Sequence, residues 1–184
     1  MQMNCGRNGV KEMIIRLTRE ELSNARQQAK LRNQLTTLTR KFDDKKDKNR
    51  TSEDLNIMGA IGEVCFAKIF DKPLILTEGI DDGTDFYLTD LGIDIKATPH
   101  TRSGVHLLFE TREAFKSSVS VLFQATNDPN MVKCCGWISK KHFLEIAEQW
   151  QNGSWAVHED NLRPIKDLWF IYKSREMKAR KIYE

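Results

Sequence analysis

The sequence predicts an α/β fold with a central mixed β-sheet flanked by helices. Two helical patterns come first, over residues 18–40 and 53–70. In the second, apolar residues recur at helical spacing, so one side should pack on a core. Short apolar runs separated by turn residues then follow one another closely, as expected of consecutive strands. A further helix is expected over residues 140–150, opened by Ser139 as N-cap.

The N-terminal part of the chain should form a strand and a basic helix. Residues 11–17 (KEMIIRL) are typical of a short strand, and Thr18 and Glu21 have the spacing of a capping box. Residues 43–50 (DDKKDKNR) contain no apolar residue, which predicts a solvated linker. We therefore divide the chain into a basic N-terminal strand/helix arm, residues 1–50, and a core domain with a C-terminal extension, residues 51–184.

The expected strands are short. They begin at residues 73, 85, 93, 105, 119 and 131, and residues 89–92 should form a turn in which Gly92 is able to take a positive φ. Within the second helix, Gly59 and Gly62 are poor helix formers, so their presence predicts close packing against a sheet or a ligand. The tail contains residues 155–158, a turn at residues 162–165 and an apolar run at residues 168–172.

Charge is distributed unevenly along the 184 residues. The first 50 residues carry 13 Lys/Arg against 6 Asp/Glu, whereas residues 51–100 carry 3 against 10. A basic arm beside an acidic centre suits a protein that holds a polyanion and binds a metal nearby, although a solvated helix surface would give the same counts. No run of 18 apolar residues occurs, so no transmembrane helix is expected.

The four cysteines, Cys5, Cys65, Cys134 and Cys135, form no C-x-x-C pair. On a strand, the adjacent Cys134 and Cys135 would point to opposite faces. We therefore expect buried free thiols rather than a zinc site or a disulfide framework. With no apolar leader segment at the N-terminus, this indicates a reducing, cytoplasmic location.

One group of charged residues has the pattern expected of an active site. Asp94 and Lys96 are two residues apart on one expected strand and so share a face, while Asp85 lies across the hairpin turn. Two close carboxylates repel each other unless a cation joins them, which Lys96 provides partly and a divalent ion would provide fully. Glu63, on the preceding helix, is a carboxylate among mostly apolar neighbours.

Gly62-Glu63 on a helix, then Asp85, then Asp94-Ile95-Lys96, resembles the PD-(D/E)xK nuclease superfamily, particularly its small phage-encoded or mobile-element members. The resemblance covers residues 55–138. It implies a restriction-endonuclease-like core with an extra N-terminal helix, and a Mg²⁺ ion (with Mn²⁺ as a substitute) held by Glu63, Asp85, Asp94 and the Ile95 carbonyl. Lys96 would be the catalytic lysine. A phage-encoded protein would act in the host cytoplasm.

Alternatives remain within this resemblance. Asp81 and Asp82 rival Asp85 as the first acid, but they lie in an Asp-Asp-Gly turn. Gln124 resembles the Gln of the exonuclease-type Q-x-x-x-Y motif, but position 128 is Asp, so endonuclease action is the better expectation.

The expected activity is hydrolysis of phosphodiester bonds in DNA; the alternative is a non-catalytic nucleic-acid or protein-binding module with the nuclease fold. The residues expected to hold the DNA backbone are basic: Arg26, Lys30, Arg32, Lys45, Lys46, Lys48 and Arg102. Because double-strand cutting often pairs two sites, a homodimer is compatible with this interpretation. No membrane partner is expected.

Overall fold

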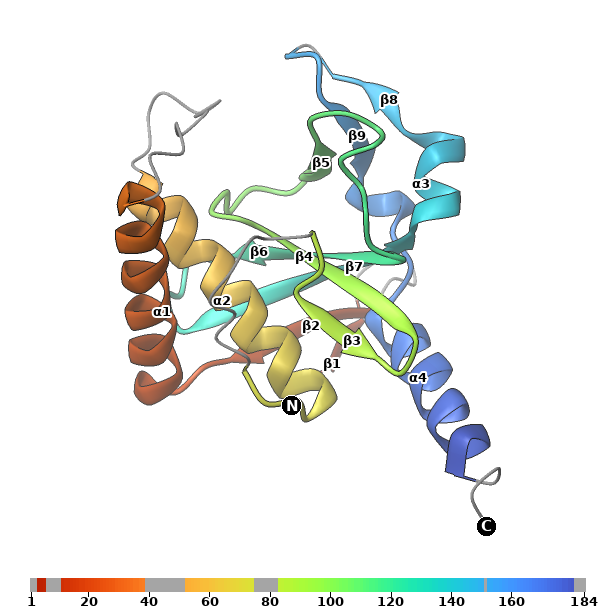
Figure 1. Cartoon of the computed structure of the whole chain (residues 1–184), viewed down its shortest axis with the longest axis horizontal. Coiled ribbons are helices and arrows are strands. Elements are labelled where there is room, and N and C mark those ends of the chain that lie inside the picture. The colour runs from red at the N-terminus through yellow and green to blue at the C-terminus, as the bar shows by residue number, and fades with distance from the viewer. Residues whose placement is uncertain (1–2, 6–10, 39–51, 75–82, 151, 181–184) are drawn as a thin grey trace.

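The main sheet of this computed structural model is mixed. The structure describes residues 3–5, 11–38, 52–74, 83–150 and 152–180. Six strands form the sheet: β1 (Met3–Cys5), β2 (Lys11–Arg16), β3 (Phe86–Leu88), β4 (Leu91–Thr98), β6 (Val119–Ala125) and β7 (Met131–Ser139). Their order is β1-β2-β7-β6-β4-β3, in which β4 and β6 run parallel and the other described neighbours antiparallel. Helices flank the sheet (Figure 1), so the predicted α/β class is confirmed.

A smaller antiparallel sheet lies beside the main one. It contains β5 (His106–Phe109), β8 (Glu148–Gln149) and β9 (Trp155–His158), in the order β5-β9-β8. The short helix α3 (Lys140–Ile146) begins after Ser139, whose Oγ accepts a hydrogen bond from the His142 amide at 3.3 Å, as predicted. This helix ends earlier than expected because residues 148–149 pair with β9 instead. A 3₁₀ turn, η1 (Glu159–Asn161), follows β9.

Residues 11–38 of the predicted arm belong to the main core. Strand β2 pairs with β7, and helix α1 (Arg19–Leu38) buries Leu22, Ala25 and Ala29 in the same hydrophobic cluster as the central strands. The predicted capping box opens α1: the Glu21 amide donates to Thr18 Oγ1 at 3.1 Å, and the Thr18 amide donates to Glu21 Oε2 at 2.6 Å. The predicted linker, residues 43–50, lies outside the described residues.

Helix α2 (Ser52–Phe70) packs beside α1 and against the sheet (Figure 1). Its closest approach is at Gly62, where an added Cβ would lie 3.0 Å from Ala97 Cβ and 3.1 Å from Ile95 Cγ2. The close packing predicted for Gly62 is therefore confirmed. The same prediction for Gly59 is wrong, since a Cβ there would meet nothing within 4 Å. Gly62 thus fixes the helix, and with it Glu63, directly above β4.

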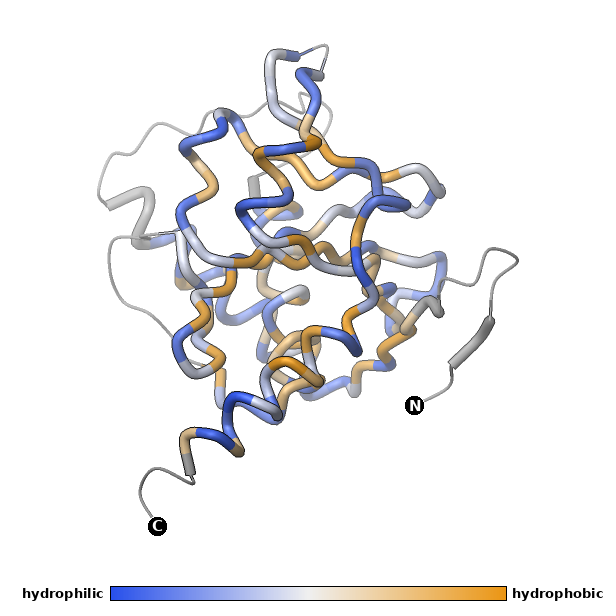
Figure 2. Tube along the Cα trace, turned by 90° about the vertical axis from the view of Figure 1, so that its right-hand side faces the viewer, coloured by the Kyte–Doolittle hydropathy of each residue, from blue (hydrophilic) through white to orange (hydrophobic). Residues whose placement is uncertain are grey.

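Two hydrophobic cores occupy opposite faces of the sheet. The larger contains residues of α1, α2 and helix α4 (Ile165–Arg180), and the smaller lies under the small sheet and α3. The adjacent Cys134 and Cys135 illustrate the division, since the first belongs to the larger core and the second to the smaller. Figure 2 shows hydrophobic residues gathered toward the middle of the trace.

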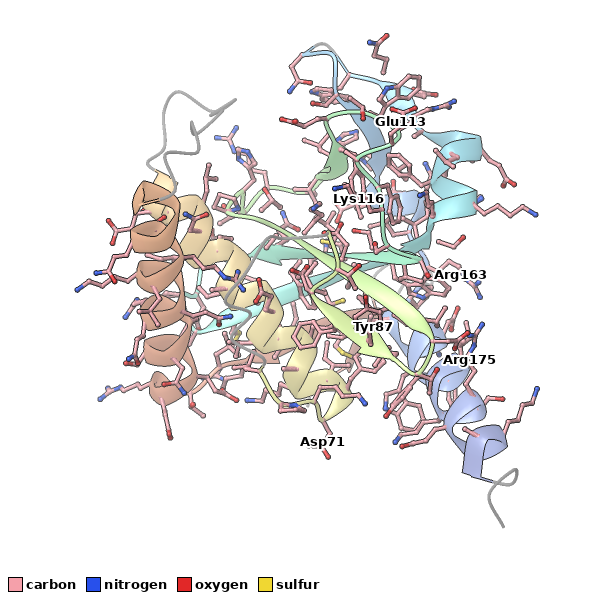
Figure 3. All side chains as sticks on the ribbon, viewed as in Figure 1. Asp71, Tyr87, Glu113, Lys116, Arg163 and Arg175 are labelled. Carbon is pink, nitrogen blue, oxygen red and sulfur yellow. The ribbon has the colours of Figure 1, made fainter. Side chains whose placement is uncertain are left out.

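Two local expectations differ from the structure. In the hairpin turn the positive φ falls on Thr89 (φ 58°) rather than on Gly92, which already belongs to β4. Pro73 and Leu74 are not in a strand, and the rest of that predicted strand lies outside the described residues. Arg175 of α4 reaches the same hairpin turn, where its Nη1 pairs with Asp90 Oδ1 at 2.5 Å; both Arg175 and Tyr87 of β3 are labelled in Figure 3. Among the described helices, none is both long and apolar enough to span a membrane.

Candidate active site

The β3–β4 hairpin brings Asp85 to the backbone between Asp94 and Lys96. Phe86 pairs with Ile93, and the Asp85 amide extends the ladder by donating to the Ile93 carbonyl at 2.8 Å. The Asp85 side chain then turns toward β4, where its Oδ2 accepts a hydrogen bond from the Ile95 amide at 2.6 Å. The predicted approach of these acids is therefore present. The rival acids Asp81 and Asp82 lie outside the described residues.

Asp94 and Lys96 share one face of β4, as the spacing predicts. Lys96 Nζ lies 2.7 Å from Asp94 Oδ1, and Ser120 Oγ donates to Asp94 Oδ2 at 3.1 Å from the neighbouring strand β6. Asp94 is only 5% exposed, because β4 is not an edge strand and the smaller core covers this face. Lys96 is half-exposed, with its ammonium 5.0 Å from the centre of the Phe109 ring.

Ile95 occupies the opposite face of β4, in the larger core. Its side chain meets Gly62 of α2, while its amide is bonded to Asp85. This residue therefore joins the helix that carries Glu63 to the strand that carries Asp94 and Lys96. The role expected of the Ile95 carbonyl as a metal ligand stays a prediction.

Glu63 is buried between α1 and α2 and is already paired. Arg32 Nη1 donates to its Oε1 at 2.5 Å and Arg32 Nη2 to its Oε2 at 2.6 Å, a two-pronged arrangement typical of strong arginine–carboxylate pairs. Gln28 Nε2 adds a bond to Oε2 at 3.1 Å. Both partners come from one face of α1, four residues apart. This spacing, opposite a buried carboxylate, is the signal that could have revealed them.

The three carboxylates influence one another. The pKa of Asp85 is raised from its ordinary 3.8 to about 7, mainly by burial and also by the charges of Glu63 and Asp94. The Ile95 amide and the Lys96 ammonium act in the opposite direction but do not restore the ordinary pKa. In the described part of the chain, Arg32 pairs with Glu63 and Lys96 pairs with Asp94. Of the three acids, Asp85 is the one whose ionised form a further cation would stabilise most.

The donor chemistry fits a hard cation. All the acidic donors are carboxylate oxygens, the ligands that Mg²⁺ prefers. The raised pKa of Asp85 shows that burial and the neighbouring acids disfavour its ionised form, which a bound cation would favour. Asp85 uses Oδ2 for the Ile95 amide, which leaves Oδ1 as the oxygen that an ion would meet. Within the described residues, however, no three His, Cys, Asp or Glu side chains are gathered as a metal-binding group. The carboxylates interact electrostatically, but in the described residues they do not form a complete set of metal ligands.

The basic residues expected to contact DNA divide into three groups. Arg26 and Lys30 are exposed on α1 and Arg102 is exposed in the loop after β4. The guanidinium of Arg32 instead forms an ion pair with Glu63. Lys45, Lys46 and Lys48 lie outside the described residues.

Gln124 is a buried structural residue in this arrangement. Its Nε2 donates to the Arg102 carbonyl at 2.6 Å, and its Oε1 accepts a weak bond from Cys135 Sγ at 3.7 Å. Its resemblance to the Gln of the Q-x-x-x-Y motif was the only signal in the sequence, whereas in the structure it holds the loop that follows β4.

The thiols are structural. Cys65, Cys134 and Cys135 are free and buried, as predicted, and burial raises the pKa of the Cys134 thiol to about 12. Such thiols are protonated and inert near neutral pH, so a cysteine nucleophile at these positions has no support.

Comparison with known proteins gave no match: no family model, no curated protein and no solved structure is similar to this chain. The resemblance to PD-(D/E)xK nucleases therefore stays a prediction from the sequence motifs quoted above.

Proposed function

We propose that this protein is a Mg²⁺-dependent nuclease that hydrolyses phosphodiester bonds in DNA, acting as an endonuclease. The observation that carries the proposal is the position of Asp85, whose carboxylate is fastened to the β4 backbone beside Asp94 and Lys96 and has a pKa of about 7. A salt-bridged surface hairpin would neutralise its charges. Here Asp85, which is half-buried, has no ion pair with a side-chain cation among the described residues, as expected of an acid that binds a metal ion.

The residues would divide the work as follows. Asp85 and Asp94 would hold the ion from the sheet, with the Ile95 carbonyl beside them, and Glu63 would complete the set from α2. When bound, Mg²⁺ supplies Lewis-acid stabilisation of phosphate charge and lowers the pKa of water. Lys96, fixed by Asp94 at 2.7 Å, would orient the attacking water or neutralise charge on the phosphate.

Arg32 would have two roles at the site, one with Glu63 and one with the DNA. By pairing with Glu63, it reduces the repulsion between this carboxylate and Asp85. A positive charge at that place also favours the approach of a phosphate, so Arg32 would help to hold DNA without leaving Glu63.

The second candidate is a non-catalytic binding module with the same fold. It is favoured by the closed Arg32–Glu63 pair and by the lack of a three-ligand metal group among the described residues. The two candidates differ in one respect, namely turnover in the presence of a metal ion.

A cleavage assay separates them. Supercoiled plasmid and branched DNA would be incubated with the purified chain in Mg²⁺, Mn²⁺, Ca²⁺ or EDTA, with Asp94→Asn as the matched inactive variant. We expect cleavage in Mg²⁺ and Mn²⁺, binding with little turnover in Ca²⁺, and none in EDTA or with the variant. DNA binding without cleavage in any metal would favour the second candidate. Equal cleavage in excess EDTA would rule out the metal-dependent mechanism.

A further inference from the structure

A groove of about 900 Å³ opens beside Lys96. The end of β4, the loop over residues 99–105, β5 and Trp150 form its walls, in the region between β4 and β5 in Figure 1. Its volume lies within the range of sites that enclose small molecules or parts of larger ligands. Because Lys96 lines it, the groove is continuous with the candidate active site.

Two cationic side chains, Lys96 and Arg102, line the groove together with His100 and His106. Burial and the neighbouring His158 lower the pKa of His106, which favours its neutral ring. None of the lining residues that the structure describes is Asp or Glu. Arg102 and His100 are exposed and form no ion pair in the described part of the chain. The groove therefore presents, next to the acidic hairpin, a surface that would attract an anion.

An open aromatic ring lies in the same groove. Trp150 is 43% exposed, and the His106 ring lies 4.2 Å from it, centre to centre, at an angle of 47°. His106 in turn contacts the ring of His158 at 4.9 Å. The indole is thus supported on one side while much of it faces solvent, beside the exposed Leu108.

The basic wall is held in place from both ends. Gln124 Nε2 donates to the Arg102 carbonyl at 2.6 Å, and the Gly104 amide donates to Glu159 Oε1 at 2.6 Å. The Glu159 amide also donates to the Val105 carbonyl at 3.0 Å. These bonds hold the loop in position before any ligand arrives, which lowers the entropic cost of binding.

We propose that this groove binds a single-stranded segment of the DNA substrate beside the scissile phosphate, with Arg102 and His100 on its phosphates and a base stacked on Trp150. A basic groove with an exposed ring is the arrangement that holds single strands without sequence preference. Duplex DNA keeps its base faces covered, so this indole would meet one only where a strand is unpaired or a base is extruded. The inference rests on the proposed function and narrows its substrate to DNA with a single-stranded part, such as a flap or a branch.

Binding by the full-length chain, measured in EDTA, tests the groove without turnover. The probe is a fluorescent oligothymidylate of about 16 nucleotides, compared with a duplex of equal length. Trp150→Ala should weaken single-strand binding about 5- to 150-fold, as expected for the loss of one base stack. Trp150→Phe, which keeps a ring, should retain most of the affinity. Arg102→Ala should reduce the salt slope of log K by about 0.7.

Trp169→Ala is the matched control, since Trp169 is similarly exposed but lies on α4 outside the groove. It should bind like the wild type. Equal affinities of the Trp150→Ala and Trp169→Ala variants for the single strand, or tighter binding of the wild type to the duplex than to the single strand, would overturn the proposal. If cleavage depends on metal but Trp150→Ala leaves single-strand binding unchanged, the groove proposal alone would be rejected. Trp150-dependent binding with no cleavage in any metal would reject the nuclease and leave the groove standing.

Discussion

Arg32 provides the most informative single substitution. Its guanidinium makes two hydrogen bonds, of 2.5 and 2.6 Å, to a Glu63 side chain that is 9% exposed, while its own side chain is 34% exposed. Removing it leaves a buried carboxylate with the weaker Gln28 bond alone. Fully buried pairs cost about 3–5 kcal/mol when one partner is removed, and hydrogen bonds to charged groups contribute about 1.5–3 kcal/mol. Because Arg32 is partly solvated, we expect Arg32→Ala to destabilise the fold by about 2–3 kcal/mol.

Thermal and denaturant unfolding of the metal-free protein measure this loss. For a chain of this size, about 2–3 kcal/mol corresponds to a fall in Tm of roughly 4–12 °C. Arg26→Ala is the matched control, because Arg26 is exposed on the same helix and its removal should change stability by about 0.5 kcal/mol or less. In a Glu63→Gln background, Arg32→Ala should cost much less, which a double-mutant cycle would show as coupling.

Mg²⁺ adds a second readout. If Glu63 belongs to a metal site, the ion should stabilise the Arg32→Ala variant more than the wild type, since it then neutralises a carboxylate that has lost its arginine. An Arg32→Ala variant as stable as Arg26→Ala would refute the assigned pairing. A variant that is destabilised but insensitive to Mg²⁺ would remove Glu63 from the metal site.

The remaining predictions concern Asp85, Lys96 and the basic segment. Because the pKa of Asp85 is raised to about 7, its protonated form stabilises the fold at low pH, and this contribution is lost as pH rises from about 4 through about 7. Thermal melts across that window should show the wild type losing about 2–4 kcal/mol relative to Asp85→Asn; parallel curves would contradict the shifted pKa. Lys96→Ala should lower the cleavage rate at least about 100-fold with an unaltered far-UV spectrum, and a smaller loss would remove Lys96 from catalysis. Neutralising Lys45, Lys46 and Lys48 together should flatten the salt slope of duplex binding by up to about 2.7 and leave the rate at saturating DNA unchanged; an unchanged slope would make the segment a solvated linker.

Local patterns predicted the acidic hairpin well. The alternation along residues 93–97 and the turn before it were enough to bring Asp85 to Asp94 and to place Lys96 on the same face. The helical spacing around Gly62 was enough to place that residue against the sheet. Each of these inferences uses residues close in sequence, whose relation is fixed by the periods of strand and helix.

Long-range packing was not predictable in the same way. The pairing of β2 with β7 and the contact of Arg32 with Glu63 depend on segments far apart in the chain. The four-residue spacing of Gln28 and Arg32 becomes a signal only once α1 is known to pack opposite Glu63. Helix α4 was not expected because its apolar positions resemble those of a short buried run as much as those of a helix face. The groove beside Lys96 likewise depends on where the loop over residues 99–105 is fastened.

The central claim is that Asp85 belongs to a metal-dependent catalytic centre. The most direct test is the initial rate of DNA cleavage at saturating Mg²⁺ for Asp85→Asn and Asp90→Asn. Asp90 is an acid of the same hairpin, but it is exposed and pairs with Arg175 rather than facing Asp94. We predict a loss of at least about 100-fold for Asp85→Asn and less than about two-fold for Asp90→Asn. Equal rates for the two variants would contradict the assignment of the active site.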